Sequence, residues 1–164
     1  MYTKVMEELD QAVTRMVFEN YGVDQYHDGH IQSSHYSFRF NKYLEPKKAG
    51  GDTGLVSHTD KNFTSILHQN PVNGLEVNTK EGKWIVHDPR PLPSSSCSKQ
   101  VMYFSRINED EVRYSLGLFS LEQGVTHIPK ELVDDDHPLR YKPLDQLQYI
   151  LAQTRGVECT HCGV

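Results

Sequence analysis

Apolar residues recur at steps of three and four along the first part of the chain, and Gly22 follows them as a stop signal. This spacing predicts an amphipathic helix over residues 2–21. Its apolar positions are Tyr2, Val5, Met6, Leu9, Ala12, Val13, Met16 and Val17. We expect one face of this helix to pack against a sheet or a partner.

The hydrophobic pattern changes to a period of two from Tyr36 onward. Apolar Tyr36, Phe38 and Phe40 alternate with residues 37, 39, 41 and 43, which predicts a strand with one apolar and one polar side. Further short strands are predicted at residues 55–60, 64–68, 75–79, 83–87, 101–104 and 113–121. Short strands separated by turns favour a sandwich or barrel over a βαβ fold.

A last helix is predicted from Pro143, because proline suits the first turn of a helix. The chain has 164 residues, which is the length of one domain. Its apolar share is only 37% and its mean hydropathy is -0.62. This shortage of core material indicates a cavity lined by polar groups or a piece of something larger.

Charge and cysteine usage narrow the partners and the compartment. Seventeen basic against 22 acidic residues give a net charge of -5, without a basic block, so nucleic acid is not an expected partner. No apolar stretch of membrane-spanning length or signal peptide is visible, so no membrane association is expected. The three cysteines, Cys97, Cys159 and Cys162, are an odd number, which favours a reducing, cytoplasmic location. Cys159 and Cys162 have the spacing of a redox or zinc motif, and we interpret them as an ordinary tail.

His58 and Asp60 lie two residues apart at the end of a predicted strand, where side chains project from the same face. One imidazole and one carboxylate are half of the 2-His-1-carboxylate triad that binds non-haem Fe(II). The alternative is an ordinary strand end at the surface.

Arg113 and Ser115 are also two apart on a predicted strand, with Tyr114, Leu116 and Leu118 on its other face. A guanidinium and a hydroxyl on one face suit a buried carboxylate, because charge-assisted bonds from arginine are strong. Asn41 and Tyr43 could supply further donors to the same anion. The alternative is an arginine at a sheet edge beside a satisfied serine.

Together these motifs resemble one family closely, the plant soluble 2-oxoglutarate- and Fe(II)-dependent dioxygenases. The resemblance rests on Asn41-x-Tyr43, His58-Thr59-Asp60, Asn73-Gly74-Leu75-Glu76-Val77, Gly82-Lys83-Trp84 and the run from Arg113 to Phe119. The segments 131–138 and 141–143 are similar to the branch named for alkenyl-glucosinolate production.

The resemblance implies a mainly β fold with flanking helices, a double-stranded β-helix or cupin-like jelly roll. It implies that His58 and Asp60 ligate Fe(II), that Arg113 and Ser115 hold the distal carboxylate of 2-oxoglutarate, and that Tyr43, with Asn41 nearby, contacts the same cosubstrate. Such enzymes use O₂ to oxidise a small organic substrate and release succinate and CO₂. The implied division is a helical flank (1–35), a partial jelly-roll domain (36–121) and a C-terminal loop and helix (122–164).

The sequence departs from the family pattern between Trp84 and Arg113. The motif that carries the second iron-binding histidine is absent, and Lys99-Gln100-Val101 lies near its expected place. About a dozen residues, enough for two short strands, are missing, so we expect an incomplete jelly roll. His68 or His87 could serve as a substitute ligand. Two alternatives to an active oxygenase stay open: an inactive 2-oxoglutarate-binding or regulatory protein, and a non-functional fragment. The oligomeric state is not predicted.

Overall fold

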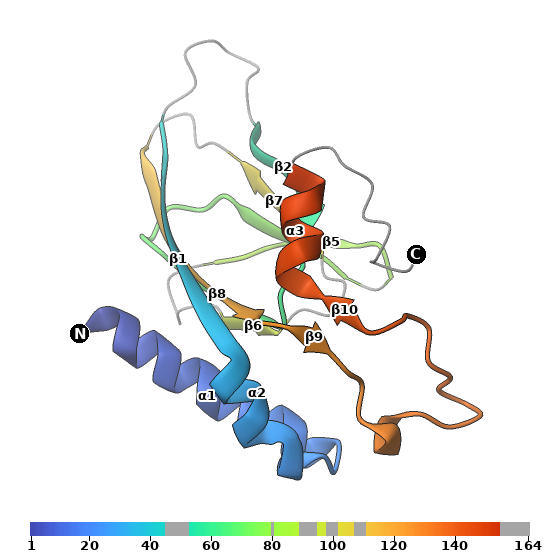
Figure 1. Ribbon diagram of the computed structural model, residues 1–164. Coiled ribbons are helices and arrows are strands. Elements are labelled where there is room, and N and C mark those ends of the chain that lie inside the picture. Colours follow the sequence, from blue (N-terminus) through green and yellow to red (C-terminus); the bar gives the residue numbers. More distant parts are fainter. Residues whose placement is uncertain (45–52, 80, 89–94, 98–101, 107–110, 155–164) are drawn as a thin grey trace. The chain divides into compact units, whose positions relative to one another are not determined.

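The computed structural model describes residues 1–44, 53–79, 81–88, 95–97, 102–106 and 111–154 (Figure 1). The chain divides into two compact units, each considered by itself. One unit combines Met1–Tyr36 with Ser120–Val164, and the other is Ser37–Phe119. This division groups residues by their spatial contacts, whereas the three parts predicted from the sequence are consecutive segments of the chain. The three-part division stays a prediction.

Two four-stranded sheets contain β1 to β8 (Figure 1). The strands are β1 (Ser34–Tyr43), β2 (Thr53–Thr59), β3 (Thr64–Gln69), β4 (Leu75–Asn78), β5 (Trp84–Val86), β6 (Ser95–Cys97), β7 (Met102–Arg106) and β8 (Arg113–Glu122). Their order is β1-β8-β3-β6 in one sheet and β2-β7-β4-β5 in the other. The chain therefore passes between the sheets at nearly every step, which is the jelly-roll arrangement predicted from the sequence.

The predicted strands agree with these two sheets to within a few residues, and among β1 to β8 only β6 was not predicted from the pattern. Each sheet has four strands among the described residues. Two of these strands, β5 and β6, have only three residues each. The loss of about a dozen residues expected from the sequence stays a prediction. Residues 99–101, near which the absent histidine motif was placed, lie outside the described part of the chain.

The remaining elements are short, apart from α1. They are α1 (Tyr2–Asn20), η1 (Asp24–Tyr26), α2 (His27–Ser33), β9 (Val125–Thr126), η2 (Lys130–Leu132), β10 (Leu144–Asp145) and α3 (Gln146–Thr154). The last helix begins after the predicted Pro143, because Leu144 and Asp145 first pair with β9. Asp145 then caps the helix, since its Oδ1 accepts the backbone N–H of Gln148 at 2.9 Å. The cysteine pair 159 and 162 lies outside the described residues.

The first helix is confirmed, but its buried stripe differs from the predicted apolar face. Met6, Asp10 and Thr14 are buried, one turn apart, whereas Val5 and Met16 are 56% and 60% exposed. The reason is a polar contact. The Tyr36 hydroxyl donates to Asp10 Oδ2 at 3.0 Å, and this hydrogen bond keeps the Asp10 side of the helix buried.

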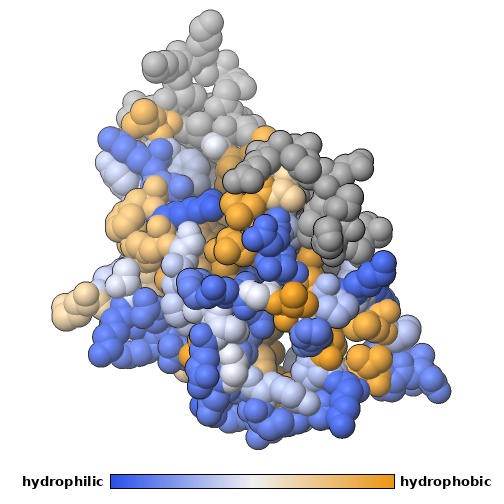
Figure 2. All heavy atoms as spheres, in the orientation of Figure 1, coloured by the Kyte–Doolittle hydropathy of each residue, from blue (hydrophilic) through white to orange (hydrophobic). Residues whose placement is uncertain are grey.

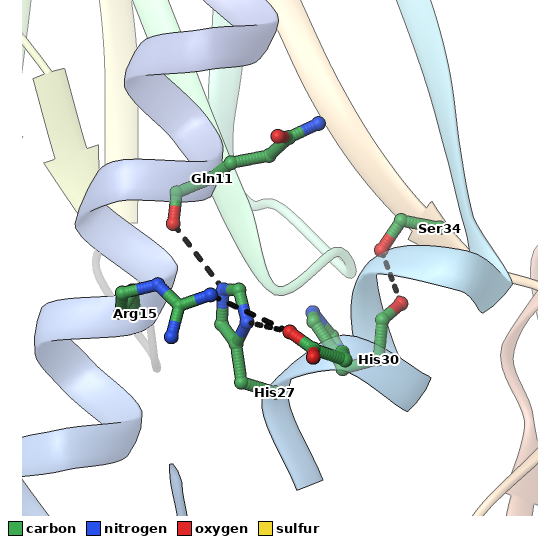
Figure 3. Close-up of polar contacts among 6 residues, drawn as sticks. Gln11, Arg15, His27, His30 and Ser34 are labelled. Carbon is green, nitrogen blue, oxygen red and sulfur yellow. Dashed lines mark hydrogen bonds and ion pairs between the residues drawn. The ribbon is translucent and has the colours of Figure 1, made fainter.

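A second polar cluster joins α2 to α1 (Figure 3). His27 is buried, with Nε2 3.4 Å from the Gln11 carbonyl oxygen and Nδ1 3.0 Å from Asp28 Oδ1. Arg15 Nη2 lies 3.4 Å from the same Asp28 oxygen. The bond from His27 lowers the pKa of Asp28, with a smaller contribution from Arg15. These polar contacts hold α2 against α1, together with the Phe18 ring, which packs against the His27 and His30 rings.

Buried polar side chains outnumber buried apolar ones among the described residues, as the low apolar share led us to expect. Ile66, Val72, Leu75 and Leu118 form the buried apolar set of the Ser37–Phe119 unit. Several large apolar side chains are exposed instead, and Figure 2 shows apolar groups interspersed with polar ones on the visible face. No helix in the described part of the chain is both long and apolar enough to cross a bilayer.

Candidate functional site

The pairing of β3 with β8 decides which side chains share a face. Residues that lie opposite each other in an antiparallel pair point to the same side, and the side alternates along each strand. The site face therefore carries Arg113, Ser115, Gly117 and Phe119 on β8 and Ser65, Leu67 and Gln69 on β3. Tyr114, Leu116 and Leu118 lie on the other face, as the alternation predicted.

The second sheet contributes His58 and Ser105. His58 on β2 is in register with position 103 of β7, two residues before Ser105, so His58 and Ser105 lie on the same face of their sheet. Ser105 contacts Arg113 of the first sheet directly, which identifies this face as the one turned toward the site. All of these residues belong to the Ser37–Phe119 unit.

Arg113 is the largest fully buried side chain in the site, at 1% exposure. Its Nη1 donates to Gln69 Oε1 at 3.0 Å and its Nη2 to Ser105 Oγ at 2.7 Å. Its Cζ lies 3.9 Å from the centroid of the Tyr43 ring, a close cation–π contact. The guanidinium is thus fixed on three sides by three different strands.

The charge of this guanidinium lacks a local counter-ion. Within the described residues no carboxylate pairs with Arg113, and its buried Nε has no hydrogen-bond partner. Burial lowers the pKa of Arg113, which the nearby Tyr43 partly opposes, but an arginine stays protonated at neutral pH. A buried cation with an unused donor is the arrangement that an anionic ligand would complete.

Asn41 and Ser115 form a neighbouring donor pair. Asn41 Nδ2 donates to Ser115 Oγ at 3.2 Å. A serine hydroxyl has one proton and can also accept, so a bond accepted from Asn41 leaves the Ser115 proton available to a ligand. The four residues predicted to hold a carboxylate therefore form two contacting pairs, Arg113 with Tyr43 and Ser115 with Asn41.

His58 and Asp60 converge at the end of β2, as predicted. His58 Nε2 lies 3.4 Å from Asp60 Oδ1, and the two side chains are 37% and 13% exposed. His58 Nδ1 lies 2.9 Å from the Val56 carbonyl oxygen, which can only accept, so Nδ1 carries the proton. In the neutral ring Nε2 then turns its lone pair toward the carboxylate, an arrangement that a bound cation would stabilise.

Comparison with known proteins identifies the family of this fold and these motifs. The model of the 2OG-Fe(II) oxygenase superfamily, where 2OG is 2-oxoglutarate, matches residues 30–121, more than half of the chain. The chain belongs to this superfamily. The family's cofactors are Fe(II) and 2-oxoglutarate, with O₂ as cosubstrate, and its members are oxidoreductases.

The chain is similar to several plant proteins. A probable 2-oxoglutarate-dependent dioxygenase AOP1 of Arabidopsis thaliana is 36% identical over 168 residues, which cover 92% of this chain and 56% of that protein. A dioxygenase AOP3 of the same plant is 38% identical over 122 residues, covering 64% of this chain and 30% of that protein. The chain thus spans about half the length, or less, of these relatives.

Solved structures agree on the fold. The crystal structure of a rice dioxygenase for auxin oxidation covers 98% of this chain and 59% of its own, with a TM-score of 0.78 and 25% identity. The Arabidopsis thaliana dioxygenase for auxin oxidation, solved with 2-oxoglutarate, covers 84% of this chain and 57% of its own, at a TM-score of 0.72 and 28% identity.

A third metal ligand is not found among the described residues, where no three His, Cys, Asp or Glu side chains gather. His68 lies opposite Leu116 in the β3–β8 register, so it points away from the face of Arg113 and Gln69. His87 follows β5, and its buried Nε2 has no hydrogen-bond partner within the described chain. Neither histidine therefore completes a triad with His58 and Asp60 in this structure.

Three residues of the site were not predicted from the sequence: Ser65, Gln69 and Ser105. Ser65 Oγ donates to Asp60 Oδ2 at 2.6 Å, while Gln69 and Ser105 hold Arg113. Gln69 and Ser105 lie on other strands than Arg113, and a turn separates Ser65 from Asp60. The available signal was alternation on β3, where Ser65 and Gln69 are four residues apart and hence on one face.

Proposed function

We propose that this oxygenase binds 2-oxoglutarate through Arg113, with Ser115, Tyr43 and Asn41 lining the same site. The observation that carries the proposal is the buried guanidinium, which has no carboxylate partner in the described chain and an unused Nε donor. A carboxylate here would neutralise the charge and accept the free N–H groups of the arginine fork. The Ser115 hydroxyl would donate its remaining proton to the same group.

The residues also fit part of a metal site. His58 Nε2 and Asp60 Oδ1 would hold Fe(II), which supplies the O₂ chemistry of the family when it is bound. The contact from His58 Nδ1 to the Val56 carbonyl fixes the tautomer and orients the ring. Ligand number sets affinity, so two ligands in the described chain predict weaker metal binding than three.

The proposed activity is the oxidation of a small organic substrate of plant specialised metabolism, with release of succinate and CO₂. Similarity to plant 2-oxoglutarate-dependent dioxygenases supports it. We place the activity in the predicted jelly-roll domain, residues 36–121, and the protein in the cytoplasm, in line with its odd number of cysteines.

Two measurements test the proposal. Calorimetry should show that 2-oxoglutarate binds the wild-type chain, and that added Co(II), a redox-stable substitute for Fe(II), strengthens the binding. Succinate formation should then depend on both Fe(II) and O₂ under turnover conditions. An Asp60→Ala variant that binds Co(II) as tightly as the wild type would remove the metal site from the proposal.

A second candidate is a protein that binds 2-oxoglutarate without oxidising anything. The absence of a three-ligand cluster in the described residues favours it. This candidate predicts 2-oxoglutarate binding that is indifferent to metal and no succinate above the background of heat-treated protein. The proposed oxygenase predicts the opposite result in both assays.

A further inference from the structure

A chain of buried polar groups lies behind the Asp60 carboxylate, in the turn between β2 and β3 and at the start of β3. Ser65 is fully buried and Asn62 is 9% exposed. Ser65 Oγ lies 2.6 Å from Asp60 Oδ2, and Asn62 Nδ2 lies 3.0 Å from Ser65 Oγ. Asn62 Nδ2 also donates to the Thr64 carbonyl oxygen.

The direction of each proton in this chain follows from the donor and acceptor chemistry. The Thr64 carbonyl can only accept, so the Asn62 atom beside it is the amide nitrogen, which can only donate. Ser65 Oγ therefore accepts from Asn62 and must give its single proton elsewhere. Asp60 Oδ2 is 2.6 Å from Oγ, whereas Asn62 Oδ1 is 3.4 Å away, so the proton goes to Asp60.

This bond fixes which carboxylate oxygen is free. Oδ2 is engaged by Ser65, and Oδ1 is the oxygen that lies 3.4 Å from His58 Nε2. We propose that Ser65, oriented by Asn62, is a positioning residue that holds Asp60 for metal binding through Oδ1. The inference rests on the proposed metal site. The orientation of Asp60 matters more here than in a site with three described ligands, because only two side chains define the position of the metal.

The test is a calorimetric titration of the whole chain with Co(II), without oxygen chemistry. Ser65→Ala should weaken Co(II) binding by about 10- to 100-fold, the usual effect of losing a hydrogen bond to a metal ligand. Ser65→Thr keeps the hydroxyl and should restore most of the affinity. The visible absorption spectrum of bound Co(II) should shift in Ser65→Ala and return in Ser65→Thr, which a general loss of stability would not produce.

Asn62 supplies an independent check. Asn62→Ala should weaken Co(II) binding less than Ser65→Ala does, because the hydroxyl remains but is no longer oriented. Combining both substitutions should add little to the loss from Ser65→Ala alone, since Asn62 acts through Ser65. Fully additive losses would show that Asn62 acts by another route and would overturn its part of the proposal.

Ser120→Ala is the matched control, because Ser120 is also a buried serine but lies on the other face of β8. It should leave Co(II) affinity unchanged. Equal affinities of the wild type and Asp60→Ala would overturn the metal site and this inference with it. If Asp60→Ala loses affinity while Ser65→Ala keeps that of the wild type, the metal site stands and the positioning role is wrong. Unchanged 2-oxoglutarate binding by Ser65→Ala in the absence of metal would confirm that the variant is folded.

Discussion

At the scale of single residues, Arg113 decides whether the site binds an anion. Arg113→Met keeps much of the side-chain volume and removes the charge, so 2-oxoglutarate affinity should fall by about 100-fold or more, as expected for lost hydrogen bonds to a charged group. At 100 times the wild-type dissociation constant, 2-oxoglutarate should stabilise the wild type by about 2.7 kcal/mol and the variant by about 0.4 kcal/mol or less. Thermal melts with and without 2-oxoglutarate measure this difference.

The control for that experiment is Arg140→Met, which removes an exposed arginine from the other unit. It should retain the full ligand-induced rise in melting temperature. A ligand-induced rise that survives in Arg113→Met would show that 2-oxoglutarate binds elsewhere.

Local spacing predicted some of these residues and could not predict others. His58 with Asp60, and Arg113 with Ser115, are two apart on a strand, so alternation alone brings each pair to one face. Gln69 and Ser105 reach Arg113 from strands 44 and 8 residues away in the chain, through pairings that no local pattern reports. The sheet register had to be known before these contacts could be assigned.

At the scale of elements, a side chain at position 117 of β8 would require the Phe119 ring to shift. A Cβ there would lie 2.6 Å from Phe119 Cε2 and 3.2 Å from Leu67 Cδ2. Gly117→Ala should therefore cost about 1–3 kcal/mol of unfolding free energy through overpacking, as measured by urea denaturation. Trimming the ring in a Gly117→Ala/Phe119→Leu double variant should recover part of the loss.

Gly29→Ala in α2 is the contrasting variant, because nothing lies within 4 Å of the added Cβ. It should leave stability unchanged or raise it slightly, since alanine favours the helix. Equal costs at positions 29 and 117 would contradict the packing explanation for β8.

The contact between α1 and β1 predicts a specific loss of stability in alkali. Burial, with help from Asp10, raises the pKa of Tyr36 to about 12, above the ordinary value of 10. Because the folded-state pKa is the higher one, this contribution is complete below pH 10 and is lost as the pH rises toward 12. Tyr36→Phe should lose less stability than the wild type between pH 10 and 12, as followed by urea melts across that range. Parallel pH curves for the two proteins would contradict the role of Tyr36.

The same contact explains why the apolar pattern misplaced the buried face of α1. Periodicity counts apolar residues, whereas the buried stripe here includes Asp10 and Thr14 beside Met6. A hydrogen bond from a tyrosine 26 residues away made a charged position the inward one. The type and bounds of α1 thus followed from the sequence, but the choice of its buried face depended on a distant partner.

At the scale of the whole molecule, the low apolar share has a partial explanation in the site. Arg113, Ser115, Ser105 and Ser65 are all buried within the unit Ser37–Phe119. A core with so many polar groups gains less from apolar burial and depends on hydrogen bonds being satisfied. Binding a carboxylate at Arg113 should therefore stabilise this unit in particular.

Hydrogen exchange read by mass spectrometry tests that expectation. Saturating 2-oxoglutarate should slow amide exchange in β3 and β8, residues 64–69 and 113–119, because these strands carry Gln69, Arg113 and Ser115. Amides of α1, which belongs to the other unit, should exchange at nearly the same rate with and without the ligand, since local openings there leave the site intact. Arg113→Met should greatly reduce the protection in both strands at the same ligand concentration. Equal protection of α1 would show that the two units open as one, and the ligand would then stabilise the whole chain through a single cooperative transition.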